Sequence, residues 1–196
     1  MTDPVQLALV GLGRMGSVHA HALAALDGID VVAVADPSAD ARASASLLFP
    51  TARLLAEPAD AFELAGVEAC LLATPTPLHP GQVRAALAAG LHVLCEKPLS
   101  LDPAESVELD QAATRAGRVL QLGFWRRYAP PWRAAKHALE QGRIGDALYV
   151  RLSQWDADPP PASFCDPTVS GGLAIDCGVH EYDLAEWFTG RRVVRL

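Results

Sequence analysis

Short apolar runs alternate with longer segments of mixed polarity along the chain up to Gly123. The runs are nearly continuous in apolar residues, which is typical of parallel strands covered on both faces. This alternation predicts an α/β fold, in which a doubly wound parallel sheet carries helices on both faces. The strands are expected at 5–10, 31–35, 69–73, 92–95 and 119–122. The helices between them are expected at 14–26, 39–48, 79–89 and 103–116.

The pattern changes after Gly123, where we predict the boundary between two domains, 1–123 and 124–196. The second domain is expected to contain, in order, a helix at 130–141, a strand at 147–155, a proline-rich loop at 156–170, a helix at 172–189 and the start of a strand at 193–196.

Composition narrows the class of protein. A net charge of −7 argues against nucleic acid as the main partner. The apolar runs are too short to cross a bilayer and no leader-like segment opens the chain, so we expect a cytoplasmic protein without a membrane partner. The four cysteines lack C-x-x-C spacing, which favours reduced thiols.

A glycine-rich motif follows the first strand and opens the first helix. Gly11 would allow a tight turn, Gly13 a close approach of a pyrophosphate, and Gly16 close packing of helix on strand. The diphosphate would lie on the free N–H groups at the helix N-terminus, beside Arg14 and Met15. The motif in this context predicts a dinucleotide site of the Rossmann type. The alternative interpretation is an ordinary glycine turn.

Two further features mark the sheet edge at which ligands of this fold bind. Asp36 ends the second strand, where its carboxylate can accept the adenosine ribose hydroxyls and would repel a 2′-phosphate, so NAD is favoured over NADP. Thr74, Pro75 and His79 belong to the segment after the strand at 69–73 and are candidate cofactor contacts. The alternatives are a surface aspartate for Asp36 and a helix-capping turn for the second segment.

Candidate chemistry lies in two places. Glu96, Lys97 and Pro98 follow the strand at 92–95, so Lys97 would emerge beside the cofactor and could stabilise a developing alkoxide. Asp176 and His180 are four residues apart on a predicted helix, which places them on one face. A histidine near neutral pKa suits the base that takes a hydroxyl proton.

Each of these residues also has an interpretation without a catalytic role. Lys97 could be a surface lysine in a strand–helix loop, and Asp176 with His180 an ordinary helix-surface pair. No third and fourth ligand stand at motif spacing, so we predict no metal site. His19 and His21 are two apart on a helix and face different ways, so both are interpreted as structural.

Taken in order along the chain, these residues resemble the Gfo/Idh/MocA family, the glucose-fructose oxidoreductase and inositol 2-dehydrogenase group. The matching pieces are 11–16, Asp36, 74–79, 96–98, 123–128 and 171–172 leading to Asp176 and His180. The resemblance implies that Lys97, Asp176 and His180 are catalytic and bind substrate, with Glu96 and Lys97 beside the cofactor. It also implies that Arg127, and less strongly Trp155, line the substrate pocket, and that substrates are cyclic polyols, sugars or sugar acids.

Family members are longer than this chain, and their second domain is an open, mostly antiparallel sheet. The resemblance therefore implies an incomplete α+β domain here, holding only the first strand and first helix. Uncovered Leu173, Trp187 and Phe188 would each forfeit roughly 1.5–3 kcal/mol of burial. The chain would then be a truncated product, a fragment, or a protomer covered by a partner, and we expect a homo-oligomer.

The function expected is an NAD-dependent dehydrogenase that transfers a hydride between a cyclic polyol, sugar or sugar acid and the nicotinamide. One alternative is an NAD-dependent glycosidase, which the same family contains. Another is a non-catalytic NAD-binding regulator, or a fragment that binds NAD and does nothing else. The presence of Lys97, Asp176 and His180 argues against a pure binder.

Overall fold

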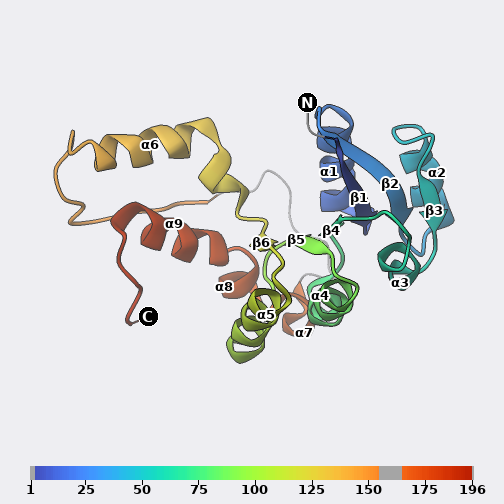
Figure 1. Ribbon diagram of the computed structural model, residues 1–196. Coiled ribbons are helices and arrows are strands. Elements are labelled where there is room, and N and C mark those ends of the chain that lie inside the picture. Colours follow the sequence, from blue (N-terminus) through green and yellow to red (C-terminus); the bar gives the residue numbers. More distant parts are fainter. Residues whose placement is uncertain (1–2, 155–164, 196) are drawn as a thin grey trace. The chain divides into compact units, whose positions relative to one another are not determined.

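The computed structural model describes residues 3–154 and 165–195, which divide into two compact units, Met1–Gly123 and Phe124–Leu196 (Figure 1). The first unit is built on a six-stranded parallel sheet with the strand order β3-β2-β1-β4-β5-β6. The strands are β1 (Val5–Val10), β2 (Ile29–Ala35), β3 (Arg53–Leu55), β4 (Ala69–Leu72), β5 (His92–Cys95) and β6 (Leu120–Leu122). This order confirms the predicted doubly wound Rossmann sheet, whose switch point lies between β1 and β4.

Helices cover both faces of this sheet. They are α1 (Arg14–Ala24), α2 (Ala39–Ser46), α3 (Pro58–Phe62), α4 (His79–Ala88) and α5 (Pro103–Ala116). Side chains of β1 alternate between two separate cores: Leu7 and Leu9 pack with residues of α1 and α2, whereas Ala8 and Val10 pack with residues of α3, α4 and α5. Both faces are therefore buried, which explains the continuous apolar run.

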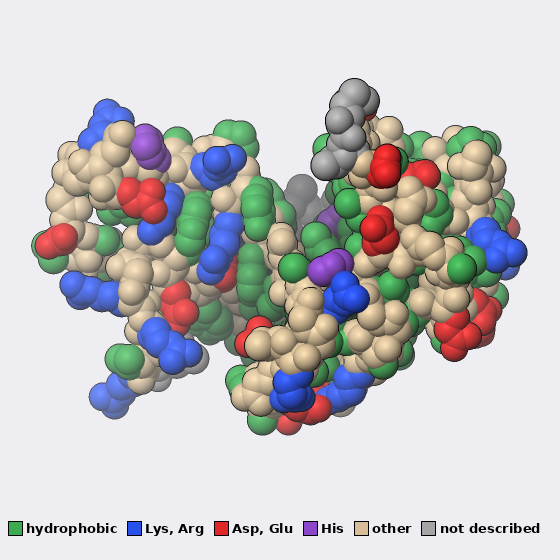
Figure 2. Space-filling view, viewed as in Figure 1, with side chains coloured by type: hydrophobic (Ala, Val, Ile, Leu, Met, Phe, Trp, Pro, Cys, Tyr) green, Lys and Arg blue, Asp and Glu red, His purple; other side chains and the backbone are tan. Residues whose placement is uncertain are grey.

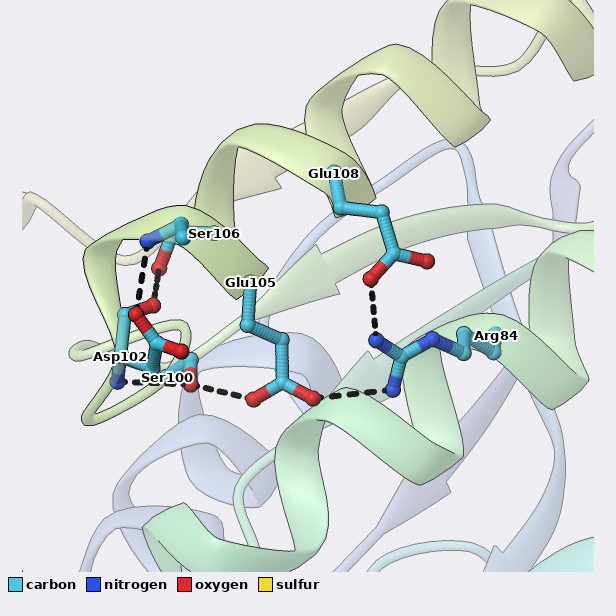
Figure 3. Close-up of polar contacts among 7 residues, drawn as sticks. Arg84, Ser100, Asp102, Glu105, Ser106 and Glu108 are labelled. Carbon is cyan, nitrogen blue, oxygen red and sulfur yellow. Dashed lines mark hydrogen bonds and ion pairs between the residues drawn. The ribbon is translucent and has the colours of Figure 1, made fainter.

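An ion-pair network joins α4 to α5 on the surface of the first unit (Figure 3). The Arg84 guanidinium donates to Glu105 at 3.0 Å and to Glu108 at 2.7 Å. The Ser100 hydroxyl donates to the other oxygen of the Glu105 carboxylate. The network orders the start of α5 but lies on an exposed surface, so its contribution to stability is small.

One strand and one α-helix of the first unit were not expected from the sequence. The edge strand β3 has only three residues, two of them exposed, and α3 has only five. Such short pieces produce no hydrophobic period that a sequence pattern can reveal.

The second unit contains a 3-10 turn (Trp125–Tyr128) followed by helices. They are α6 (Pro130–Glu140), α7 (Pro167–Ser170), α8 (Leu173–Asp176) and α9 (Val179–Thr189). Trp132 of α6 packs on Phe188 of α9 with ring centroids 6.1 Å apart.

Both strands predicted for the second unit are wrong as far as the structure describes them. Residues 147–154 and 193–195 form no strand. A strand needs a neighbour for its backbone hydrogen bonds, and the described residues 124–154 and 165–195 hold no other strand to supply one. Leu148 and Tyr149 remain 95% and 82% exposed. Figure 2 shows apolar side chains at the surface of this unit among its charged ones.

Candidate functional site

The glycine motif forms a tight loop between β1 and α1. Gly11 has φ +88°, and a Cβ there would lie 2.7 Å from the carbonyl of Ala73. A Cβ at Gly16 would lie 1.9 Å from the carbonyl oxygen of Gly11, because the helix packs directly on the loop. A Cβ at Gly13, by contrast, would have nothing within 4 Å. Gly11 and Gly16 therefore allow the loop to pack tightly against Ala73 and α1, while Gly13 leaves space for a ligand.

The N-terminus of α1 can receive an anion in that space. Gly13 caps the helix without a side-chain hydrogen bond, and the first turn contains no acidic residue. The N–H groups of the first turn and the helix dipole both favour negative charge there. Arg14 begins the helix with an exposed side chain, and Met15 follows half-buried. This end of α1 can hold a diphosphate.

Asp36 lies immediately after β2 and beside the glycine loop. Its Oδ2 accepts from the Leu12 N–H at 2.7 Å, and its Oδ1 accepts from the Ser38 N–H at 2.8 Å. These two bonds fix the carboxylate next to the loop. Each oxygen has a further lone pair, so the group can still accept a hydrogen bond from a ligand hydroxyl.

The segment after β4 is held by two side chains of α4. The Thr74 hydroxyl donates to Gln82 at 2.6 Å. His79 is 1% exposed, and its Nε2 and Nδ1 each lie 2.8 Å from a carbonyl oxygen, those of Thr74 and Pro98. Burial lowers the pKa of His79 by more than these carbonyls and Glu96 raise it. The ring of His79 therefore supports the loop from inside, and Pro75 lies exposed in the same loop.

Glu96 is buried directly before Lys97. Its Oε1 lies 2.7 Å from His19 Nε2, and its Oε2 accepts from the Lys97 N–H at 3.1 Å. Burial raises the pKa of Glu96, but the hydrogen bonds of His19 and the Lys97 N–H, with the charges of both residues, lower the pKa below its usual range. A Cβ at Gly123 would lie 3.0 Å from this carboxylate, so the carboxylate fills the space over Gly123.

The contact of His19 with Glu96 is one that sequence reasoning missed, since it assigned His19 a structural role. His19 lies three residues after Gly16, one turn into α1, so both face the same way. The position of His19 on the same helix face as Gly16 was the sequence signal from which this contact could have been predicted. His21, two residues on, is exposed, and its Nδ1 lies 2.8 Å from the Ser17 carbonyl oxygen of its own helix.

Asp176 and His180 do not share one regular helix, so that prediction is wrong. Asp176 ends α8, and His180 lies in the first turn of α9. A Cβ at Gly178 would lie 2.4 Å from the Ala174 carbonyl oxygen, and the Gly178 N–H bonds to Leu173, five residues back. The chain therefore bends at Cys177–Gly178.

His180 is buried in the second unit against aromatic rings. It is 5% exposed, and the ring centroids of Phe124 and Trp125 lie 6.1 and 6.4 Å from its own, both edge-on. The next residue, Glu181, accepts from Arg126 at 2.6 Å. His180 therefore packs the start of α9 against the turn that begins the unit.

Arg127, a predicted pocket residue, is bound to α9 through Asp183. Its Nε and Nη2 donate to the two Asp183 oxygens at 2.9 and 2.6 Å, and its guanidinium lies 6.0 Å from the centre of the Trp187 ring. The Asp183 side chain is only 7% exposed. Trp155, the other predicted pocket residue, lies outside the described residues.

Replacing Arg127 with alanine should lower the free energy of unfolding by about 1–3 kcal/mol, because a buried carboxylate loses its bidentate partner. Urea unfolding of Arg127→Ala, Asp183→Asn and the double variant would measure the coupling, which we expect at about 1–2 kcal/mol. Arg143→Ala, an exposed arginine of the same unit, is the control. Additive effects of the two changes would contradict the pairing.

The candidate residues fall into two groups by unit. The glycine loop, Asp36, residues 74–79 and residues 96–98 lie in the first unit, at the carboxyl ends of β1, β2, β4 and β5. Asp176 and His180 lie in the second. Among residues 3–154 and 165–195, no group of three or more metal-binding side chains is gathered. In the same residues, no helix has the length and apolar character needed to cross a membrane.

Comparison with known protein families gives two matches. Residues 5–124 match the oxidoreductase family with an NAD-binding Rossmann fold, and residues 132–196 match the GFO/IDH/MocA C-terminal domain.

Two relatives match nearly the whole chain. The rhizopine catabolism protein MocA of Rhizobium meliloti is 37% identical over 95% of the chain, and scyllo-inositol 2-dehydrogenase (NAD(+)) of Bacillus subtilis is 32% identical over 100%. Each match covers 57% of the relative, so the chain spans a little over half the length of these proteins.

Solved structures superpose on nearly the whole chain. A probable dehydrogenase from Thermotoga maritima superposes with a TM-score of 0.89 at 31% identity, covering 96% of this chain and 56% of that one. The scyllo-inositol dehydrogenase of Lactobacillus casei with bound NAD(H) and scyllo-inositol gives 0.81 at 28% identity, covering 96% and 57%.

Proposed function

The chain belongs to the Gfo/Idh/MocA family of oxidoreductases, and from this we propose that it is the cofactor-binding and catalytic part of an NAD-dependent dehydrogenase. The proposed reaction oxidises a CH–OH group of a cyclic polyol or a related sugar to a carbonyl. The observation that carries the proposal is the presence, on one sheet edge, of an open dinucleotide loop and of Lys97. The names of the relatives support a polyol of the inositol class.

The residues present fit an NAD molecule. The uncovered N-terminus of α1 at Gly13 fits the diphosphate, and the fixed carboxylate of Asp36 fits the ribose hydroxyls. Thr74 and Pro75 follow the neighbouring strand β4 and would border the same site. When bound, the nicotinamide supplies the acceptor for the hydride.

The chain's own residues would then handle the proton and the charge on oxygen. A ring nitrogen of His180 takes the hydroxyl proton, while the Lys97 ammonium stabilises the negative charge that develops on that oxygen. Asp176 orients the substrate, and Arg127 and Trp155 contribute to the pocket wall. The carbinol would lose its hydroxyl proton to His180, and its hydride would pass to the bound nicotinamide, which would leave the ketone. A homo-oligomeric state and a cytoplasmic location stay predictions.

The direct test is NADH formation by the purified protein with NAD and a panel of inositols, sugars and sugar acids. We expect NADH with at least one cyclic polyol. An aryl glycoside in the panel tests the glycosidase alternative, in which the aryl group is released without net NADH. Protein that binds NAD and turns over none of these substrates would contradict the dehydrogenase and leave an NAD-binding regulator or fragment.

Replacing Asp36 with asparagine should weaken the preference for NAD over NADP by about 10-fold, because the charge that repels a 2′-phosphate is removed. The dissociation constants of both cofactors, measured by calorimetry on the wild type and the variant, would check this. Asp40→Asn is the matched control, since Asp40 is exposed in the first turn of α2. An unchanged ratio of the two constants would argue against Asp36 as the ribose contact.

A further inference from the structure

Both neighbours of Lys97 are held by a histidine, and each histidine comes from a different helix. His19 of α1 bonds the Glu96 carboxylate at 2.7 Å, and His79 of α4 lies 2.8 Å from the Pro98 carbonyl oxygen. Glu96 in turn accepts from the N–H of Lys97 itself at 3.1 Å. The backbone on each side of Lys97 is therefore fixed by an imidazole.

The His19 contact links Lys97 to the dinucleotide loop. His19 stands one turn after Gly16 on α1, the helix whose N-terminus would receive the diphosphate. Its partner is 77 residues away in sequence, and the Glu96 side chain is 9% exposed. A bond between an imidazole and a buried, ionised carboxylate is of the strong, charge-assisted kind. It sets the distance between α1 and the loop that carries Lys97.

The His79 contact links Lys97 to the loop after β4. The ring is buried between the carbonyl oxygens of Thr74 and Pro98, each 2.8 Å from one ring nitrogen. A flat ring with nitrogens on two sides spans these loops, whereas an asparagine side chain is too short to reach both. A neutral imidazole has one N–H, so His79 donates one hydrogen bond to one of these oxygens, and the buried ring holds the loops after β4 and β5 against each other through that bond and its packing between them.

We propose that His19 and His79 are positioning residues that hold Lys97 in a fixed place relative to the dinucleotide loop. The proposal rests on the function proposed above for Lys97. Neither imidazole has to touch the substrate or the cofactor. His19 acts through the carboxylate of Glu96, and His79 acts through the backbone of Pro98. The nearby His21 differs, because its ring bonds the Ser17 carbonyl of its own helix and not the loop that carries Lys97.

The chain contains just two lysines, Lys97 and Lys136, so the Lys97 amine can be observed directly. Reductive methylation with isotope-labelled formaldehyde keeps the charge and gives one NMR signal for each lysine, with a further one for the N-terminal amine. We expect His19→Gln and His79→Asn to move the Lys97 signal and its pH titration, and to leave the Lys136 signal in place. The control His21→Gln should move neither signal.

Turnover by the unmethylated variants gives the second readout. We expect kcat to fall about 10- to 100-fold in His19→Gln and His79→Asn, because a displacement of about 1 Å costs that much. The dissociation constant of NAD should stay within a few-fold of the wild-type value.

Folded variants with an unmoved Lys97 signal and unchanged kcat would overturn the proposal. If His79→Asn fails to fold, His19→Gln still decides, since the His19 side chain is partly exposed. Failure of the proposed function looks different: the wild type forms no NADH with any substrate, while the NMR comparison still shows whether the two histidines fix Lys97.

Discussion

Replacing Lys97 with methionine should lower kcat by about 10²- to 10³-fold, the effect expected when one preorganised group that stabilises an oxyanion is removed. Methionine keeps much of the length and apolar stem of lysine, so the change removes mainly the ammonium. Glu96 keeps its bonds to His19 and to the backbone N–H of residue 97, so the loop should hold its shape. The dissociation constant of NAD should change little, because the diphosphate and ribose contacts lie at α1 and Asp36.

Steady-state kinetics with the best polyol of the panel, beside NAD binding by fluorescence, would measure both quantities. The control is Lys136→Met, which removes the other lysine of the chain. Lys136 lies on α6, 3.4 Å from Glu140 and 5.9 Å from the centre of the Trp187 ring, and has no part in the proposed chemistry. A Lys97→Met variant that keeps full kcat would refute the catalytic role of Lys97.

The fold of the first unit could be predicted from sequence because its strands are buried on both faces. Burial on both faces requires continuous apolar runs in the sequence, such as 5–10, and the helices between the strands have ordinary lengths. The strand β3 and the helix α3 were not predicted, because both are too short to show a hydrophobic period. In the second unit a run such as 147–154 has the composition of a strand, but a strand forms only where another one can pair with it.

The candidate site shows a similar division between local and tertiary information. The glycine loop could be predicted because the geometry of a turn is a local property. The bond from His19 to Glu96 could not, since it joins residues far apart in sequence. The bend at Gly178 had a faint signal, because a glycine inside a helix costs about 1 kcal/mol relative to alanine. The close approach of the Ala174 carbonyl that requires this glycine is a property of the folded chain.

Two glycines of the dinucleotide loop, Gly13 and Gly16, should respond to alanine in distinct ways. Gly16→Ala should lower the free energy of unfolding by about 3 kcal/mol or more, because its Cβ would lie 1.9 Å from the Gly11 carbonyl oxygen. The gain in helix propensity, about 0.5–1 kcal/mol, is too small to offset this. Helix and loop would have to separate, and NAD binding would be lost with the fold of the loop.

Gly13→Ala should instead leave the free energy of unfolding within about 0.5 kcal/mol of wild type and weaken NAD binding about 100-fold. Its backbone, at φ −62° and ψ −164°, suits alanine, and the new methyl group meets nothing within 4 Å in the protein. The methyl group would occupy the space through which a diphosphate approaches the N–H groups of α1. Urea unfolding and calorimetric NAD titration of both variants would separate the two effects. If Gly13→Ala bound NAD as tightly as the wild type, the diphosphate could not lie against Gly13. If Gly16→Ala were as stable as the wild type, α1 would not need its close contact with the loop.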